Sequence, residues 1–115
     1  MAFSESELAQ CEQAMAAYMK RRRPPEHIRN QVDLGYRIQD QSVEIFEIRP
    51  GWRNPDEIME IPIAKSTYVR ARDVWKIYWW RSDMKWHPYD PDAEVDSIEA
   101  FLAVVDRDEY GCFFG

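Results

Sequence analysis

The stretch VWKIYWWR, residues 74–81, indicates how the rest of this chain folds. Successive side chains of a strand point to opposite faces, and large apolar residues occur on both faces of this segment. Such a strand lies in the interior of a sheet and is covered on both sides. If helices cover only one face, a partner chain, a loop or a ligand must cover the other. One face carries Trp75, Ile77 and Trp79, and the opposite face carries Val74, Tyr78 and Trp80.

Turn signals on both sides of this segment indicate an antiparallel meander. Arg72-Asp73 turns the chain before it, and Ser82-Asp83 turns the chain after it. The flanking strands are expected over residues 63–71 and 85–89. Three strands that follow one another with short turns form a meander.

An earlier pair of strands is predicted from a hydrophobic period of two. Residues 28–39 alternate between apolar and polar side chains, with a strand start as late as Gln31. Asp40-Gln41 is expected to form a tight turn into a strand over residues 43–49, so the pair forms a hairpin. A loop over residues 50–57 follows, with turn chemistry from its glycine, asparagine and prolines.

Two amphipathic helices are expected at the ends of the chain. Ser4 and Glu7 have the spacing of a capping box, and the helix that they begin ends before Pro24. The second helix is expected to start near Asp96, with Glu99 at the capping-box spacing. Its apolar stripe consists of Ile98, Phe101, Leu102 and Val105.

The basic run KRRRPPEHIR, residues 20–29, permits two interpretations. Cations at the end of a helix stabilise its negative dipole end, and a cluster of cations can also contact phosphates. The sequence favours the first interpretation, because the dipole alone accounts for the cations.

Length and composition are those of an ordinary globular domain. The chain has 115 residues, of which 45% are hydrophobic and 31% charged, and its formal net charge is −6. We expect one domain, residues 1–115, with an α+β fold: an antiparallel sheet of about five strands, a hairpin plus a three-strand meander, between two helices. No apolar run approaches the roughly 18 residues of a membrane span, and the acidic N-terminal region does not fit a secretory leader. A cytoplasmic protein without a disulfide is expected, and Cys112-Phe113-Phe114 should pack into the core.

Several segments together resemble a known family. They are QVDLGYRI (31–38), VEIFEIRP (43–50), VWKIYW with RxDxKWHxY (74–89), and FLAVVD with DEYGCFFG (101–115). The sequence resembles a family of short bacterial proteins catalogued as domain of unknown function 3024. The resemblance implies a bacterial cytoplasmic protein and implies no activity or catalytic residue.

The strongest candidate site combines cations with aromatic rings around the last two strands. A cationic strip beside such rings suits a phosphate, a carboxylate or a stacked base. The alternative is a solvated strand face on which Lys and Arg stems cover the rings. The candidate binding residues are Lys76, Tyr78, Trp80, Arg81, Lys85, His87 and Tyr89.

A metal-dependent nuclease or related hydrolase is the alternative function. Asp33, Glu47 and Lys65 could gather from neighbouring strands, as carboxylates and a lysine do around Mg²⁺. The pattern faintly resembles that of restriction endonucleases, but Arg49 stands where that pattern has lysine. The hypothesis requires the three side chains to converge. No zinc-binding spacing and no glycine-rich phosphate loop occurs, so no cofactor or metal is expected.

Charge is divided unevenly along the chain. Residues 65–87 contain six Lys or Arg against two Asp, whereas residues 90–109 contain eight acids against one Arg. This layout indicates either internal pairing or a basic groove for an anionic partner. The sequence therefore favours a binding or interaction protein over an enzyme. Its basic-aromatic sheet surface would meet an anionic ligand, for example nucleic acid, or a second copy in a homodimer.

Overall fold

The segment with apolar residues on both faces forms β4, an interior strand of the sheet, as predicted. The computed structural model describes residues 2–114. Its elements are α1 (Glu5–Arg22), the short 3-10 turn η1 (Glu26–Ile28), β1 (Asp33–Gln39), β2 (Ser42–Pro50), β3 (Ile58–Val69), β4 (Val74–Trp80), β5 (Trp86–Pro88), the 3-10 turn η2 (Asp90–Asp92), β6 (Glu94–Val95) and α2 (Ile98–Arg107).

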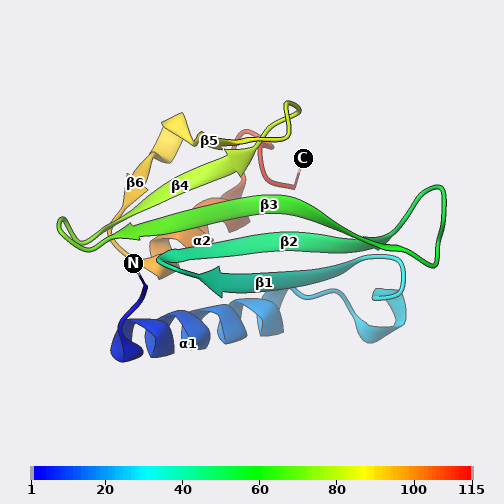
Figure 1. Ribbon diagram of the computed structural model, residues 1–115, viewed down its shortest axis with the longest axis horizontal. Helices are drawn as coiled ribbons and strands as arrows, with labels where there is room; N and C mark the ends of the chain where they lie inside the picture. The colour runs from blue at the N-terminus through cyan, green and yellow to red at the C-terminus, as the bar shows by residue number, and fades with distance from the viewer. Residues whose placement is uncertain (1, 115) are drawn as a thin grey trace.

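The strands form one antiparallel sheet in the order β1-β2-β3-β4-β5 (Figure 1). The predicted hairpin and meander are therefore parts of a single longer meander, because β2 also pairs with β3. The short strand β6, which the sequence did not predict, pairs with β4 at Trp75 and Lys76. β5 pairs with the other end of β4, at residues 78–80.

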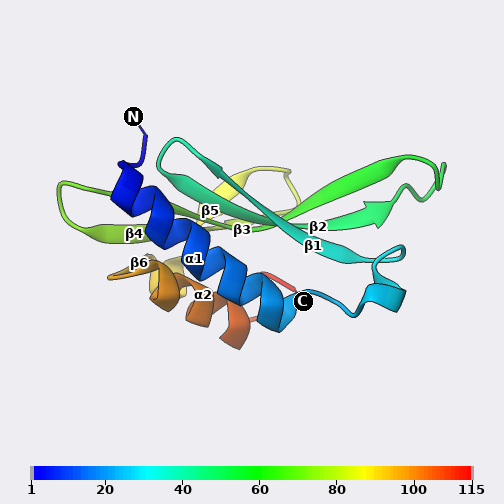
Figure 2. The same cartoon turned by 90° about the horizontal axis from the view of Figure 1, so that it is seen from below.

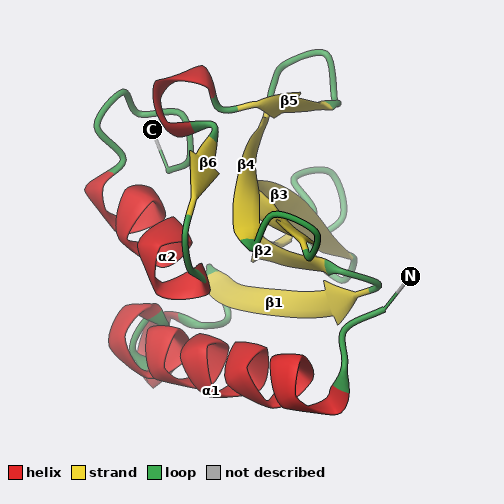
Figure 3. Ribbon diagram, turned by 90° about the vertical axis from the view of Figure 1, so that its left-hand side faces the viewer, coloured by secondary structure: helices red, strands yellow, loops and turns green. Residues whose placement is uncertain are grey.

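Both helices lie on the same face of the sheet (Figures 2 and 3). The hydrophobic core fills the space between that face and the helices. The opposite side of the sheet, which we call the open face, has no helix over it among the described residues. The core includes Cys11, Met15 and Tyr18 of α1, Phe101, Leu102 and Val105 of α2, and Val43, Ile45 and Ile77 of the sheet.

The capping box predicted for the first helix is confirmed. The backbone N–H of Glu7 donates to the Ser4 hydroxyl at 3.2 Å, and the Ser4 N–H donates to the Glu7 carboxylate at 2.8 Å. The start predicted for the second helix was one residue early. Ser97 is the N-cap, and its hydroxyl accepts from the Ala100 N–H at 3.0 Å. Glu99 therefore stands one position too early to complete a capping box.

The predicted bounds of all five strands needed correction, although β2 is only one residue longer at each end. β1 begins at Asp33, because η1 turns the chain before it and the N–H of Val32 donates to the carbonyl of Ile28. β3 begins at Ile58 and ends at Val69, five residues earlier at its start and two earlier at its end than predicted, so it includes Pro62. Pro62 is accommodated because the β2–β3 register shifts beside it, and such irregularities tolerate a residue without an N–H. β4 and β5 are shorter than predicted, at residues 74–80 and 86–88.

Gly35 allows an aromatic ring to lie flat on β1. A Cβ at Gly35 would be 2.8 Å from Cε2 of Phe46, its cross-strand partner on β2. The guanidinium of Arg37, two residues along β1, lies 4.5 Å from the centre of the same ring. A side chain at position 35 would push Phe46 away, so glycine here fixes an aromatic residue on the open face.

The C-terminal segment packs into the core, as predicted. Asp108 ends α2 with a left-handed backbone (φ 39°), and its carboxylate accepts from the N–H groups of Phe113 at 3.0 Å and Phe114 at 2.8 Å. The Phe113 ring then lies 4.9 Å from the ring of Tyr89, which directly follows β5. The segment thereby supports β5 from the helix side of the sheet.

Replacing Asp108 by Asn should loosen this segment without changing the backbone, since Asn also tolerates the left-handed conformation. Hydrogen bonds to a charged acceptor contribute about 1.5–3 kcal/mol. We expect Asp108→Asn to lower the free energy of unfolding by about 1–2 kcal/mol in urea titrations. Glu109→Gln, an exposed neighbour, is the matched control. Equal stabilities for the two variants would contradict this role of Asp108.

Candidate functional site

The open face carries a cluster of aromatic rings and cations over β3, β4 and β5. Cross-strand partners lie on the same face of a sheet, and Lys65 is paired with Tyr78 and Trp80 with Trp86. The alternate residues of β4 point to the helix side, where Trp75 and Ile77 are buried. We call Lys65, Lys76, Tyr78, Trp80 and Trp86 the aromatic-basic cluster.

Trp80 and Trp86 are the two indoles of this cluster. Their ring centres are 5.1 Å apart and their planes are inclined at 72°, an edge-to-face pair. Both rings are half-buried, so each keeps part of its surface accessible to solvent. The two rings shield each other only in part, and no helix of residues 2–114 covers this side. Another flat ring can therefore stack on them.

Lys65 lies over the aromatic rings. Its ammonium nitrogen is 5.8 Å from the ring centres of both Tyr78 and Trp86. Glu44 is its cross-strand neighbour on β2, but the two side chains do not form an ion pair. An ammonium beside rings and free of a carboxylate is available to an external anion.

Arginines in this molecule are mostly paired internally, and lysines are not. Among the described residues, every ion pair has an arginine or a histidine as its cation. In the basic run, Arg21 and Arg22 contact Asp106 at 2.8 and 3.3 Å, and Arg23 binds Asp33 at 2.8 Å. The run therefore holds α1 to the rest of the fold, in keeping with the helix-end interpretation.

The structure divides the predicted binding residues into three groups. Lys76, Tyr78 and Trp80 lie on the open face, and Arg81 and Lys85 flank the turn between β4 and β5. The guanidinium of Arg81 lies 5.2 Å from the ring centre of Trp79.

The remaining two predicted residues are placed differently. His87 is the cross-strand partner of Trp79, on the other face, and its Nε2 lies 2.7 Å from the Asp83 carboxylate. That hydrogen bond lowers the pKa of Asp83. Tyr89 is only 2% exposed against Phe113, so it cannot contact a ligand and belongs to the core.

Sequence reasoning did not include Trp86 or Lys65 among the candidate binding residues. Lys65 was considered only for the hydrolase hypothesis. The alternation along residues 85–89 placed Trp86 opposite Lys85, His87 and Tyr89, which is correct for the strand itself. Only the pairing of β5 with β4 shows that the face of Trp86 is also the face of Trp80. No signal in a single sequence gives that register.

The three residues of the hydrolase hypothesis do not converge. Both carboxylate oxygens of Asp33 accept from Arg23, which lowers the pKa of Asp33. Glu47 lines the same shallow depression as Asp33, whereas Lys65 lies on the open face beside Tyr78. Within residues 2–114, no three His, Cys, Asp or Glu side chains are grouped to hold a metal ion. The arrangement that this hypothesis requires is not formed.

Comparison with known proteins agrees with the resemblance seen in the sequence. A family described as Domain of unknown function (DUF3024) matches residues 3–115. The chain belongs to this family. No curated protein and no solved structure matches it. Among the described helices, none has the length and apolarity needed to cross a membrane.

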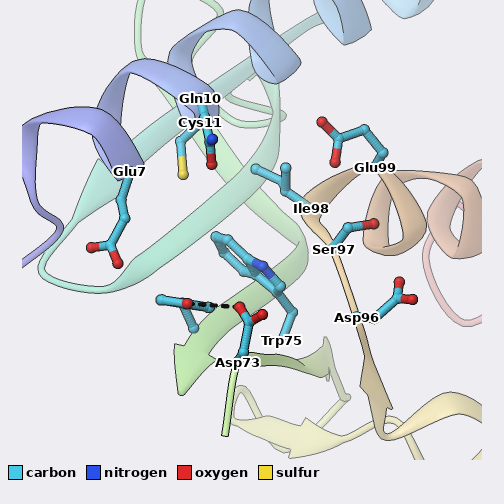
Figure 4. A pocket seen from close by; sticks show the side chains of 10 residues that line it. Glu7, Gln10, Cys11, Asp73, Trp75, Asp96, Ser97, Ile98 and Glu99 are labelled. Atoms are coloured by element: carbon cyan, nitrogen blue, oxygen red, sulfur yellow. Dashed lines mark hydrogen bonds between the residues drawn. The ribbon is translucent and has the colours of Figure 1, made fainter. Parts of the chain in front are cut away.

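This DUF3024 protein also has an acidic pocket of about 130 Å³, between the starts of both helices and the β3–β4 turn (Figure 4). Two of its four carboxylates, Glu7 and Asp73, have internal partners. Glu7 caps α1 and pairs with Arg70 at 2.7 Å, and Asp73 accepts from the Tyr68 hydroxyl at 2.8 Å. Burial raises the pKa of the Cys11 thiol, which also lines the pocket, to about 11. The pocket is therefore lined by helix-start acids and an unreactive thiol.

The Glu7–Arg70 pair predicts a pH-dependent stability. The hydrogen bond from Arg70 lowers the pKa of Glu7 from 4.5 to about 2. A carboxyl with a lowered pKa stabilises the fold above its unfolded value, and this stabilisation is lost as the pH falls from 4.5 towards 2. Glu7→Gln keeps a capping-box side chain but removes the charge.

We therefore expect Glu7→Gln to be less stable than the wild type above pH 4.5. The difference should shrink as the pH falls towards 2. Urea midpoints across this range measure the effect, and Glu5→Gln in the same helical turn is the control. A difference that does not change with pH would contradict the role assigned to the ion pair.

Proposed function

We propose that this protein binds single-stranded nucleic acid through the aromatic-basic cluster. The observation that carries the proposal is the Trp80–Trp86 pair on the open face, with the ammonium of Lys65 held over Trp86 and unpaired with any carboxylate of residues 2–114. Nucleic-acid bases stack on aromatic rings, and lysines on the same surface neutralise the phosphates between the bases. Both requirements meet on one side of β3, β4 and β5.

The charges around the cluster support an anionic ligand. Lys65 and Lys76 take part in no ion pair among the described residues, whereas Glu60 is bound by Arg37 and Glu94 by Arg72. Acids on this face are thus mostly neutralised by arginines, with Glu44 as the exception. The lysines of the open face, Lys65 and Lys76, remain to contact phosphates. Arg81 lies against Trp79 instead, on the other face of β4.

Single strands suit the cluster better than a duplex. Stacking on a protein ring requires bases that are not already stacked and paired in a duplex. The indoles offer flat ring faces for such bases, not side chains that read base edges in a groove. The net charge of −6 also argues against binding driven by phosphate contacts alone. We propose the bacterial cytoplasm as the setting, which fits the free thiols of Cys11 and Cys112.

Fluorescence anisotropy with a labelled single-stranded oligonucleotide tests the proposal. Trp86→Ala should weaken binding by about 1–3 kcal/mol, the contribution of one stacked base. Removing both lysines, with Lys65→Ala and Lys76→Ala, should reduce the slope of log K against log salt by about 1.4, because each phosphate contact contributes about 0.7 for single strands.

Lys20→Ala is the matched control, since Lys20 is an exposed lysine on α1, away from the open face. It should change neither affinity nor slope. Absence of binding at low salt would refute the proposal. A concentration-dependent dimer, detected by light scattering, would also refute the proposal if its interface buries Trp80 and Trp86. The rings would then be covered by a second copy.

A further inference from the structure

β2 and β3 continue beyond the body of the sheet as a two-stranded arm. The last pair between β1 and β2 joins Asp33 and Ile48, while β2 and β3 stay paired as far as Pro50 and Ile58. We call residues 49–59 the arm. It lies at one end of the longest axis of the molecule, which measures 45 Å, and it projects from the body in two perpendicular views (Figures 1 and 2).

The arm exposes apolar side chains that the core does not use. Trp52 is 77% exposed and Ile58 75%, and Met59 is also exposed. Large apolar side chains gathered on a projecting element indicate a contact surface. Because the arm is only two strands wide, it has no second layer of its own that could cover them.

The tip of the arm repeats the chemistry of the aromatic-basic cluster. The guanidinium of Arg53 lies 4.5 Å from the ring centre of Trp52, and Arg53 takes part in no ion pair among residues 2–114. The loop is held by its own hydrogen bonds, from Gly51 N–H to the Glu57 carbonyl at 2.8 Å and from Glu57 N–H to the Asn54 carbonyl at 3.0 Å. Trp52 is therefore presented on an ordered turn.

A continuous surface joins the arm to the cluster. Phe46 pairs with Pro62, and Pro50 with Ile58, four residues further along each strand, so all four share one face. Phe46 lies over Gly35 on the open face. Between these two pairs Ile48 faces Glu60, and Arg37 binds Glu60. Arg37 also covers the ring of Phe46, which is only 7% exposed. The open face of the body thus continues onto the arm past an internally neutralised ion pair.

We propose that the arm is a second stacking site for the same strand of nucleic acid, with Trp52 and Arg53 holding a base at a distance from Trp80 and Trp86. This inference rests on the proposed function and adds a minimum ligand length. Ile58 of the arm and Lys65 of the cluster are seven residues apart along β3, which is roughly 23 Å at about 3.3 Å per residue. At about 3.4 Å per nucleotide, a strand of about twelve nucleotides spans roughly 41 Å and one of about four spans roughly 14 Å. A strand of about four nucleotides reaches one site only.

The carboxylates of the arm decide how the tip contacts the strand. Asp56 and Glu57 are exposed beside Trp52 and would repel phosphates. At the tip, the strand must then be bound by stacking on the Trp52 ring. Lys65 and Lys76 make the contacts with the phosphates. Loss of Trp52 should therefore weaken binding without changing its salt dependence.

The experiment compares oligothymidylates of about four and about twelve nucleotides by anisotropy titration. The longer probe should bind the wild type more tightly than the shorter one. The gain in affinity should exceed the factor that follows from the larger number of binding positions on a longer strand. Trp52→Ala should weaken binding of the longer probe about tenfold and leave the shorter probe unchanged. Trp52→Phe should retain most of the affinity, because its ring can still stack. Tyr110→Ala, which removes a ring that is 63% exposed elsewhere on the surface, is the matched control.

The outcomes separate this inference from the proposed function. If the longer probe binds and Trp52→Ala has no effect, the arm is not a second site and the cluster alone binds. A reduced salt slope in Trp52→Ala would also overturn the stacking role of the tip. If neither probe binds, the proposed function fails and the inference fails with it. If sedimentation shows a wild-type dimer that Trp52→Ala converts to a monomer, the arm contacts a second copy of the chain instead.

Discussion

The rest of the structure depends on one constraint: β4 carries large apolar rings on both faces, but the helices cover only one. On the helix side, Trp75 and Ile77 are buried among α1, α2 and the C-terminal segment. On the open face, the rings of Trp80 and Trp86 pack edge to face against each other, and Lys65 lies over Trp86. Because this coverage is incomplete, some apolar surface stays in contact with water, which is unfavourable for folding. The same surface is available for stacking with a flat ligand.

The charges of this molecule follow from the different chemistry of its two cations. Arginine presents a rigid fork that matches a carboxylate, so Arg23, Arg70 and Arg21 join distant parts of the chain to Asp33, Glu7 and Asp106. Lysine is a strongly hydrated point charge with no such preference. The acids and the arginines are therefore largely matched to each other, with Asp106 of α2 bound by the arginines at the end of α1. The net negative charge does not describe the open face.

Local signals in the sequence were reliable where a single element was involved. The capping box of Ser4 and Glu7, the two faces of β4 and the packing of Phe113 were all predicted. Predictions failed where a neighbouring strand decides the outcome. Pro62 lies inside β3 because β2 shifts register beside it, and β6 exists only because β4 offers Trp75 and Lys76 as partners. Tyr89 was expected at the surface, but the C-terminal segment buries it.

The sequence by itself determined the two helices, the five longer strands and the alternation that puts Tyr78 and Trp80 on one side of β4, since these depend on contacts within a few residues. Only the tertiary structure decided that this side stays open, that Trp86 and Lys65 complete the cluster, and that Trp52 stands on an arm beyond β1. The physical reason is that contacts between residues far apart in the chain set both the cross-strand register and the side on which the helices pack. Such contacts leave no periodic pattern in a single sequence.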